Sequence, residues 1–387
     1  MSTQQILGEH TYDDRGFLAR LSLFDWVWAV ALLLGSVYAS YHFAPWMDRY
    51  EHGILYLTWA STVAIGWMWK PARLFTIIVA AVTLFAVMRY PDLAAAESDF
   101  FLNYLLSSQA AIMWMCALFL AAPVVYFAGL LGRAAFLERL GTAMMWLASG
   151  AGLVGLLVRW WESYLIAPEV GRIPVTNLYE VFVLFAFTTG LIYLYYEYRY
   201  QTRALGGFVG LIIAASIGFL LWYHFVQGAH EIDPLIPALQ SWWMKIHVPT
   251  NFVAYGAFAI AAMIGVAYLI QARMPDAWQR RGLPSPEVMD DLMYKNIALG
   301  FAFFTIATIL GALWAAEAWG GYWSWDPKET WSLITWLNYA AWLHLRFTKG
   351  WRGTPMAWWA VVGLFVVTFT FLGVNIFLSG LHSYGEL

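Results

Sequence analysis

Charged residues are scarce in this sequence of 387 residues. Lysine, arginine, aspartate and glutamate make up 12% of the chain, whereas 61% is hydrophobic and the mean hydropathy is +0.61. An ordinary globular domain carries about 25% charged residues, so the composition excludes that class and indicates an integral membrane protein. The formal net charge is −3 and no basic patch stands out, which argues against nucleic acid as a partner.

Cysteine is almost absent as well. The single residue, Cys116, lies inside the apolar run 110–131, which excludes an internal disulfide and any CxxC metal or thiol-relay motif. We interpret it as membrane packing. Residues 1–20 lack the basic segment and short apolar core of a cleavable signal, so we expect membrane insertion to begin with the first span.

Long apolar runs are what the sequence has instead. A helix needs about 20 mostly apolar residues to cross a bilayer, and eleven such segments recur, at 22–43, 53–69, 73–90, 107–131, 140–158, 177–196, 205–224, 249–271, 296–314, 331–347 and 355–378. The predicted fold class is all-α, a polytopic integral membrane helical bundle of about eleven transmembrane helices. Segments 53–69, 73–90 and 331–347 are short enough to be tilted or partly re-entrant.

The basic residues predict the orientation, because Lys and Arg accumulate on the cytoplasmic side. With the N-terminus inside and the C-terminus outside, 15 of the 21 basic residues fall on the inner side. The outer six are Arg49, Arg89, Arg159, Arg172, Lys245 and Lys328. The segment 315–330, the loop 225–248 and the tail 379–387 then face outward together.

The segment 314–331 is too polar to cross a bilayer and unusually aromatic for a loop. Its aromatic residues are Trp314, Trp319, Tyr322, Trp323, Trp325 and Trp331, interleaved with Gly320, Gly321, Asp326, Lys328 and Glu329. Planar rings beside a few charges and flexible glycines would suit a flat conjugated ligand. A membrane-interface belt of Trp and Tyr is the alternative interpretation.

Two histidines flank this segment on the predicted outer face. His247 begins a span at its outer end, and His382 follows the last span. Two neutral imidazoles can fill both axial positions of a haem iron, although hydrogen bonds to headgroups or water would also explain interface histidines. His344 lies near the inner end of the span 331–347, where an ionisable group is a functional candidate or snorkels to the interface. As a metal ligand it would need an imidazole from a partner subunit.

The stretch Trp319-Gly-Gly-Tyr-Trp-Ser-Trp-Asp-Pro-Lys-Glu-Thr-Trp331 closely resembles the tryptophan-rich WWD signature of the CcsA family, also called ResC, of cytochrome c biogenesis system II. Segment 172–180 (RIPVTNLYE) and segment 335–346 (TWLNYAAWLHLR) are also similar to that family. The resemblance covers residues 107–387, whereas residues 1–106, with three spans, lie outside it as an extension of unknown role.

The resemblance implies a set of haem-handling residues. His247 and His382 would be the external axial ligands, and His344 one of two transmembrane ligands. The full implied set is His247, His382, His344, Trp314, Trp319, Gly320, Tyr322, Trp323, Trp325, Asp326, Glu329 and Trp331. The implied ligand is haem b, as a transported and ligated substrate. No residue of the chain is predicted to act as a catalytic acid, base or nucleophile.

The resemblance also implies location and partners. The chain would lie in the cytoplasmic (inner) membrane, in contact with lipid, as the CcsA-type subunit of a CcsB–CcsA cytochrome c synthase. A CcsB (ResB) subunit would supply the second inner ligand, and apocytochrome c would receive haem through its CxxCH thiols. A haem-binding respiratory subunit and a membrane transporter are the alternative functions.

Smaller roles are expected for charges near the signature. Lys328 and Arg172 are candidates to pair with haem propionates, with ordinary interface charge as the alternative. Asp326 and Glu329 are expected to orient the loop or an imidazole rather than bind iron.

Overall fold

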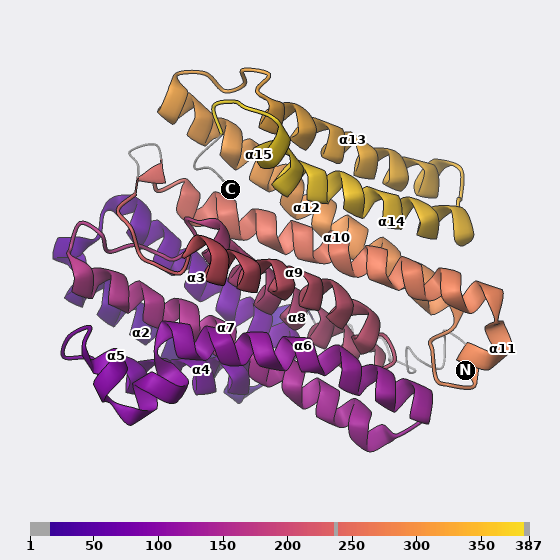
Figure 1. Ribbon diagram of the computed structural model, residues 1–387, viewed down its shortest axis with the longest axis horizontal. Coiled ribbons are helices and arrows are strands. Elements are labelled where there is room, and N and C mark those ends of the chain that lie inside the picture. Colours follow the sequence, from indigo (N-terminus) through magenta and orange to yellow (C-terminus); the bar gives the residue numbers. More distant parts are fainter. Residues whose placement is uncertain (1–15, 236–238, 383–387) are drawn as a thin grey trace. The chain divides into compact units, whose positions relative to one another are not determined.

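The computed structural model describes residues 16–235 and 239–382, which form helices and connecting segments with no β-strand among them (Figure 1). The all-α prediction is thereby confirmed. The chain divides into two compact units, Met1–Val82 and Thr83–Leu387. The predicted functional boundary at residue 106 stays a prediction.

The first unit is built on two long helices and the start of a third. They are α2 (Leu23–His42), α3 (Arg49–Met68) and α4 (Pro71–Val87), with short 3₁₀ turns at Phe17–Arg20 and Ala44–Trp46. The indole N–H of Trp59 on α3 donates to the Ala29 carbonyl of α2 at 3.1 Å. A buried ion pair between Asp25 and Arg73 joins the start of α2 to α4. Polar contacts therefore fix helices whose surfaces are otherwise mostly apolar.

The second unit contains eight long helices. They are α6 (Ser108–Gly132), α7 (Ala135–Ile166), α8 (Leu178–Tyr200), α9 (Gly206–Gln227), α10 (Met244–Arg273), α12 (Pro286–Trp319), α13 (Pro327–Thr348) and α14 (Thr354–Thr368). A π-helical turn, Phe369–Gly373, joins α14 to α15 (Val374–Phe377). Short helices α5 (Ala95–Ser98) and α11 (Pro275–Gln279) and the π-turn Leu102–Leu106 complete this unit.

Helix α10 is the central element of the second unit. It packs against α8, α9, α12 and α14, and in Figure 1 α12, α13 and α14 lie along one side of it. Small residues permit this packing, as is usual between membrane helices. A Cβ added at Gly256 would stand 2.7 Å from the Thr189 hydroxyl of α8, and one at Gly265 would stand 2.9 Å from the Ala357 carbonyl of α14.

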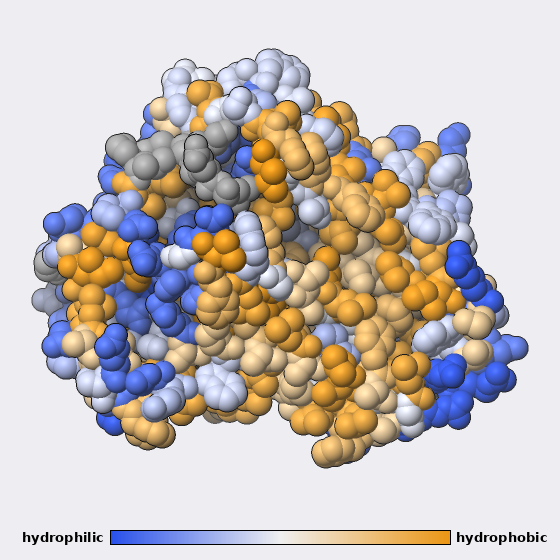
Figure 2. All heavy atoms as spheres, viewed as in Figure 1, coloured by the Kyte–Doolittle hydropathy of each residue, from blue (hydrophilic) through white to orange (hydrophobic). Residues whose placement is uncertain are grey.

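The helices present an apolar surface to their surroundings. Large hydrophobic side chains such as Phe365 and Val124 are exposed. Hydrophobic residues cover much of the face shown in Figure 2, with hydrophilic residues gathered near the α11 end and on the left side of the view. Eight helices are long and apolar enough to cross a membrane: α2, α6, α7, α8, α9, α10, α12 and the continuous segment Thr354–Phe377. Contiguous exposed apolar area of this kind marks a lipid-facing surface. The chain is a multi-pass membrane protein.

Each of the eleven predicted segments coincides with a helix. The three segments noted as short are the ones that fall outside the group of eight: α3, α4 and α13. Helix α4 has only 17 residues, whereas α3 and α13 carry charged residues in their first turns and further polar side chains along their length. Whether these three also cross the membrane, and which way the termini face, stays a prediction.

The Trp-rich segment 315–330 is less of a loop than the sequence suggested. Helix α12 continues to Trp319, and α13 begins at Pro327, so only residues 320–326 link them. Gly320 ends α12 with a φ of +80°, a left-handed conformation that favours glycine. Asp326 and Glu329 then form a capping box at the start of α13. The helix ends therefore follow these capping residues and not the fall in hydropathy, from which we had predicted a longer loop.

The α12–α14 layer has two polar ends. At one end, the Arg346 guanidinium of α13 lies 2.6 Å from the Asp290 carboxylate of α12, which also accepts from the Gly353 N–H before α14 at 3.0 Å. At the opposite end lie the last turns of α12, the first turn of α13 and residues 378–382. Since α13 rises about 1.5 Å per residue, the eighteen residues from Asp326 to His344 span about 27 Å.

Candidate functional site

The imidazole of His382 is held by the carboxylate that begins α13. His382 Nδ1 lies 3.0 Å from Asp326 Oδ1, and the Leu381 N–H donates to Asp326 Oδ2 at 2.7 Å. A Cβ added at Gly380 would stand 2.1 Å from the same Oδ2 atom, so only glycine lets the chain pass this close. If Nδ1 carries the proton that it shares with Asp326, the Nε2 lone pair faces outward as a potential metal ligand.

The electrostatics of this pair favour a neutral imidazole. Burial lowers the pKa of His382 below its ordinary value of 6.5, although the Asp326 carboxylate acts in the opposite direction. Burial alone would raise the pKa of Asp326, but hydrogen bonds from the Lys328 N–H, His382 and the Leu381 N–H lower it overall, below 3.8. Near neutral pH the site therefore combines an ionised carboxylate with an uncharged imidazole, the form that binds iron.

His247 lies in the first turn of α10 with its ring against α12. Its Nδ1 lies 2.9 Å from the Ala307 carbonyl oxygen, and its Nε2 lies 3.0 Å from Nδ2 of Asn251. Because a carbonyl only accepts, Nδ1 carries the proton and Nε2 accepts from the amide. A Cβ added at Gly311 would stand 2.8 Å from the His247 ring, so the missing side chain makes room for the imidazole.

The last two turns of α12 connect the two histidines. Trp314 meets the His247 ring edge to face with centroids 5.7 Å apart, and Trp319 meets the His382 ring in the same manner at 4.7 Å. The structure thus brings His247, His382, Trp314, Trp319 and Asp326 together at one end of the bundle.

The other residues of the 320–331 segment divide into two groups. Tyr322 and Trp325 are 65% and 68% exposed, and Trp323 packs edge to face on Trp325 with centroids 5.9 Å apart. Trp325 has a φ of +59°, which is uncommon for a non-glycine residue and is seen at ligand-binding sites. Their rings are therefore available to an external molecule.

Glu329 and Trp331 face inward instead. The buried Glu329 carboxylate accepts from the Ser324 N–H at 2.7 Å and from the Asp326 N–H at 3.3 Å, which holds the link between the helices. Trp331 packs on Phe369 of the π-turn with centroids 4.3 Å apart. The Glu329 carboxylate therefore holds the loop and Asp326 contacts an imidazole, while their part in haem handling stays a prediction.

Lys328 and Arg172, the candidates to pair with haem propionates, make hydrogen bonds within the chain. Lys328 Nζ donates to the Phe371 carbonyl and to Asn375 Oδ1, both at 2.8 Å. Arg172 donates through Nε to the Thr176 hydroxyl at 3.2 Å. The Lys328 side chain is directed into the protein, whereas Arg172 is half-buried and also donates to the Val170 carbonyl at 3.3 Å. The pairing of either cation with propionates stays a prediction. The sequence could not show the direction of the Lys328 side chain, because hydropathy does not report it.

His344 is exposed near the opposite end of α13. Within residues 16–235 and 239–382 its imidazole makes no hydrogen bond or ring contact. His344 is therefore not part of the His247 and His382 cluster. Its exposed position leaves it accessible from outside the chain.

A family model of cytochrome c assembly proteins matches residues 175–382, more than half of the chain and including both ends of this site. Curated relatives that match include CcsA proteins. The chain belongs to the CcsA family. Cytochrome c biogenesis protein CcsA of Chlamydomonas reinhardtii is 40% identical over 238 residues, which cover 59% of this chain and 64% of that protein. The match thus spans less than two thirds of that relative.

Other comparisons agree with membership of the CcsA family. A CcsA protein of Synechococcus sp. (strain CC9605) is 36% identical over 296 residues, 69% of this chain and 93% of the relative. Among solved structures, "Cytochrome c Heme Lyase CcmF" superposes with a TM-score of 0.51 over 68% of this chain and 46% of that one. At 19% identity this second likeness shows a shared fold alone.

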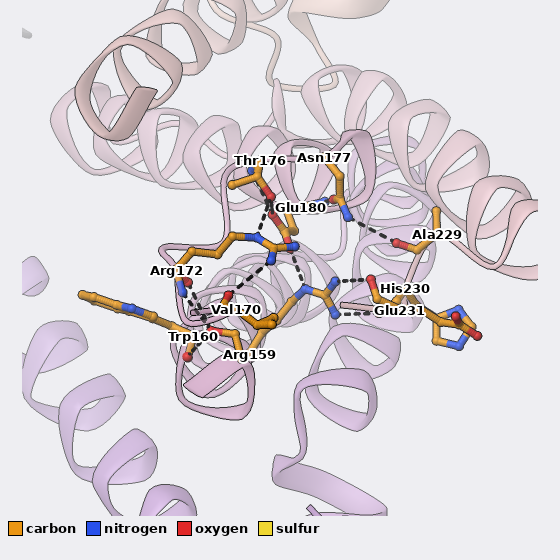
Figure 3. A network of polar contacts seen from close by, with 11 residues as sticks. Arg159, Trp160, Val170, Arg172, Thr176, Asn177, Glu180, Ala229, His230 and Glu231 are labelled. Atoms are coloured by element: carbon orange, nitrogen blue, oxygen red, sulfur yellow. Dashed lines mark hydrogen bonds and ion pairs between the residues drawn. The ribbon is translucent and has the colours of Figure 1, made fainter. Parts of the chain in front are cut away.

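A buried network anchors the segment that leads to His247 in this CcsA-family chain (Figure 3). Arg159 of α7 lies 2.8 Å from the Glu180 carboxylate of α8, and its other nitrogens donate to the carbonyls of His230 and Glu231 at 2.6 and 2.9 Å. Glu180 also accepts from the Thr176 N–H and hydroxyl. The network joins α7, the start of α8 and the segment 230–231. The family match begins at residue 175, just before α8. Arg159, predicted as one of the outer basic residues, is thus a buried structural side chain.

Sequence reasoning missed the residues that support His247. Gly311 and the Ala307 carbonyl carry no sequence signal, because they act through α12 backbone about 60 residues away in sequence from the histidine. Asn251 had a signal: a spacing of four residues places it on the same helical face as His247. Trp243 was also missed, and its indole N–H donates to Glu317 of α12 at 2.8 Å.

Proposed function

We propose that this chain receives haem and presents it on its outer face to apocytochrome c for covalent attachment. The observation that carries the proposal is the pair His247 and His382 beside the end of α12. Each ring is fixed through Nδ1, by the Ala307 carbonyl and by the Asp326 carboxylate respectively. That arrangement favours Nε2 of both rings for iron, as in most histidine ligation with an oriented outer partner.

The donor set fits haem. Two neutral imidazoles saturate the axial positions of the iron, and aromatic edges and faces suit the porphyrin. The crevice beside His382, between α13 and residues 374–380, has no room for a water-sized sphere, whereas a ligand pocket usually encloses about 300 to 1,000 Å³. A haem between the two histidines would therefore lie at an open face, where Tyr322 and Trp325 can cover it and a second protein can reach it.

Delivery to this face would begin at the other end of the bundle. We propose that His344 contributes to an inner haem b site together with a histidine of a CcsB (ResB) subunit in the cytoplasmic membrane. The exposed, unpaired imidazole of His344 supports a ligand shared with another chain. In this scheme haem crosses from the inner to the outer site.

The covalent step is an addition. Each cysteine thiol of a CxxCH segment adds across one haem vinyl group, so an S–H bond and a C=C π bond are replaced by C–S and C–H bonds, with no net oxidation. The histidine of the segment takes one axial position. The chain contributes by holding the vinyl groups near the thiols, which makes a slow bimolecular reaction effectively unimolecular.

The test is haem retention by histidine variants. His247→Ala and His382→Ala, purified with the partner subunit, should each lose most of their haem in a pyridine haemochrome assay and should fail to mature a CxxCH substrate. His52→Ala is the matched control, because its imidazole pairs with Ser40 in the first unit. Full haem content and maturation in both site variants would refute the proposal. If the unmodified protein binds haem but does not mature the substrate, a respiratory subunit is favoured. If it neither binds haem nor matures the substrate, a transporter is favoured.

A further inference from the structure

The iron-binding nitrogen proposed for His247 is occupied within the chain. Nδ1 donates to the Ala307 carbonyl, so the Nε2 lone pair is the only remaining acceptor on the ring. Asn251, one helical turn further along α10, directs its amide nitrogen to that atom at 3.0 Å. Iron and the amide N–H require the same lone pair, and only one can have it.

We infer that Asn251 competes with haem iron for His247, so that His247 is the axial ligand given up when haem passes to its acceptor. This inference rests on the proposed haem site. Asn251 acts on the iron only through the histidine, as a positioning residue. With haem bound, the amide turns aside. When the iron leaves, the amide N–H returns to Nε2 of the half-buried imidazole.

The two proposed ligands differ in this respect. His382 Nδ1 is held by Asp326, but no residue in 16–235 or 239–382 donates to its Nε2 atom. Loss of iron from His382 therefore leaves its Nε2 lone pair to the solvent, whereas loss from His247 is offset by a hydrogen bond from a residue already in place within the chain. The asymmetry predicts an order of exchange in which the incoming histidine of CxxCH replaces His247 and His382 stays bound.

The surroundings of His247 indicate that the amide, not the ring, is the part that moves. The ring lies over Gly311, is bonded to Ala307 and is bordered by Trp314. Among the residues that the structure describes, the Asn251 side chain makes one hydrogen bond, the bond to His247. Turning the amide away thus breaks a single contact, while turning the ring away would break several.

The test is the rate at which haem leaves the protein. In Asn251→Leu the side chain keeps its size and loses its donor, so haem transfer to excess apomyoglobin should slow by about fivefold, the factor of one ordinary hydrogen bond. The visible spectrum should remain that of two imidazole ligands. Thr250→Val is the control, since the Thr250 hydroxyl bonds its own helix at Ile246 and should leave the rate unchanged.

A second variant at Asn251 and a second haem acceptor provide independent measurements. Asn251→Ala replaces the leucine variant if that variant folds poorly, and it should also slow haem release. Covalent attachment of haem to a CxxCH peptide should slow by the same factor. Unchanged or faster release in the folded variants would overturn the inference while leaving the haem site intact. If His247→Ala retains the unmodified spectrum and release rate, the proposed site itself is wrong, and the inference falls with it.

Discussion

Asp326 Oδ1 lies 3.0 Å from Nδ1 of His382, and the same carboxylate caps α13 by accepting from the Lys328 N–H at 2.7 Å. One side chain thus begins a helix and orients a candidate ligand that follows the last helix. Its second oxygen accepts from the Leu381 N–H. The fold of the C-terminal segment and the geometry of the site therefore depend on the same group.

Replacing Asp326 by Asn should separate these two roles. Asn is also a good helix cap, but its neutral amide holds the imidazole more weakly than a carboxylate does. Loss of such an outer partner lowers metal affinity by about 10-fold to 100-fold, and we expect haem affinity to fall in that range with little change in thermal stability. Asp48→Asn is the matched control, because Asp48 caps α3 in the first unit. Equal haem affinity in the two variants would contradict the role given to Asp326.

Acid should release haem over a defined range. Burial lowers the pKa of His382 below 6.5, so the neutral ligand is present at and above that pH. As the pH falls from 6.5 through the lowered pKa, protonation competes with iron, and the folded state also loses stability relative to an unfolded chain that protonates earlier. Asp326 stays ionised there because its pKa lies below 3.8. A spectroscopic pH titration should show haem retained down to pH 6.5, and release completed above that pH would contradict this account.

Gly311→Ala should displace the His247 ring while keeping both proposed iron ligands in the chain. The added Cβ would stand 2.8 Å from the ring, and overpacking of this kind costs about 1 to 3 kcal/mol. We expect several-fold lower haem content and a spectrum shifted toward a single axial imidazole. Gly218→Ala on α9 is the control, since no atom lies within 4 Å of its added Cβ. The same spectrum in both variants would show that the ring does not depend on the α12 backbone.

Arg159→Met should destabilise the second unit. Both side chains of its pair with Glu180 are 2% exposed, and removing one partner of a buried ion pair costs about 3 to 5 kcal/mol. The lost bonds to the carbonyls of His230 and Glu231 should also open the chain before α10 to proteolysis. Lys295→Met breaks a pair that is 46% and 42% exposed and should change stability little. Thermal unfolding and limited proteolysis measure both effects, and a similar small change in the two variants would be contrary to the role of the network.

The helices could be predicted because apolar length alone specifies a membrane span. The Trp-rich link was harder, since hydropathy falls several residues before α12 ends at Trp319. Gly320 and the Asp326-Pro-Lys-Glu329 capping box are sequence signals for the helix ends, and they define the boundaries better than the apolar runs do. The side-chain direction of Lys328 could not be predicted, because neutral acceptors more than 40 residues away, Phe371 and Asn375, determine it.

For the candidate haem ligands, the sequence predicts the residues but not the orientation of their rings. His247 and His382 could be proposed from their places beside the Trp-rich segment. Their orientation could not, because it depends on Ala307, Gly311 and Asp326, which contact them across helix boundaries. Packing between distant segments leaves no periodic mark in a sequence.

The central claim is that His247 and His382 ligate one haem from opposite sides. The most direct test is the visible spectrum of the haem that each single alanine variant still retains, before and after addition of free imidazole. Each variant should show a five-coordinate iron that imidazole returns to the six-coordinate, bis-imidazole form, while His344→Ala should leave the outer site's spectrum unaltered. A six-coordinate spectrum in both single variants without added imidazole would contradict the account.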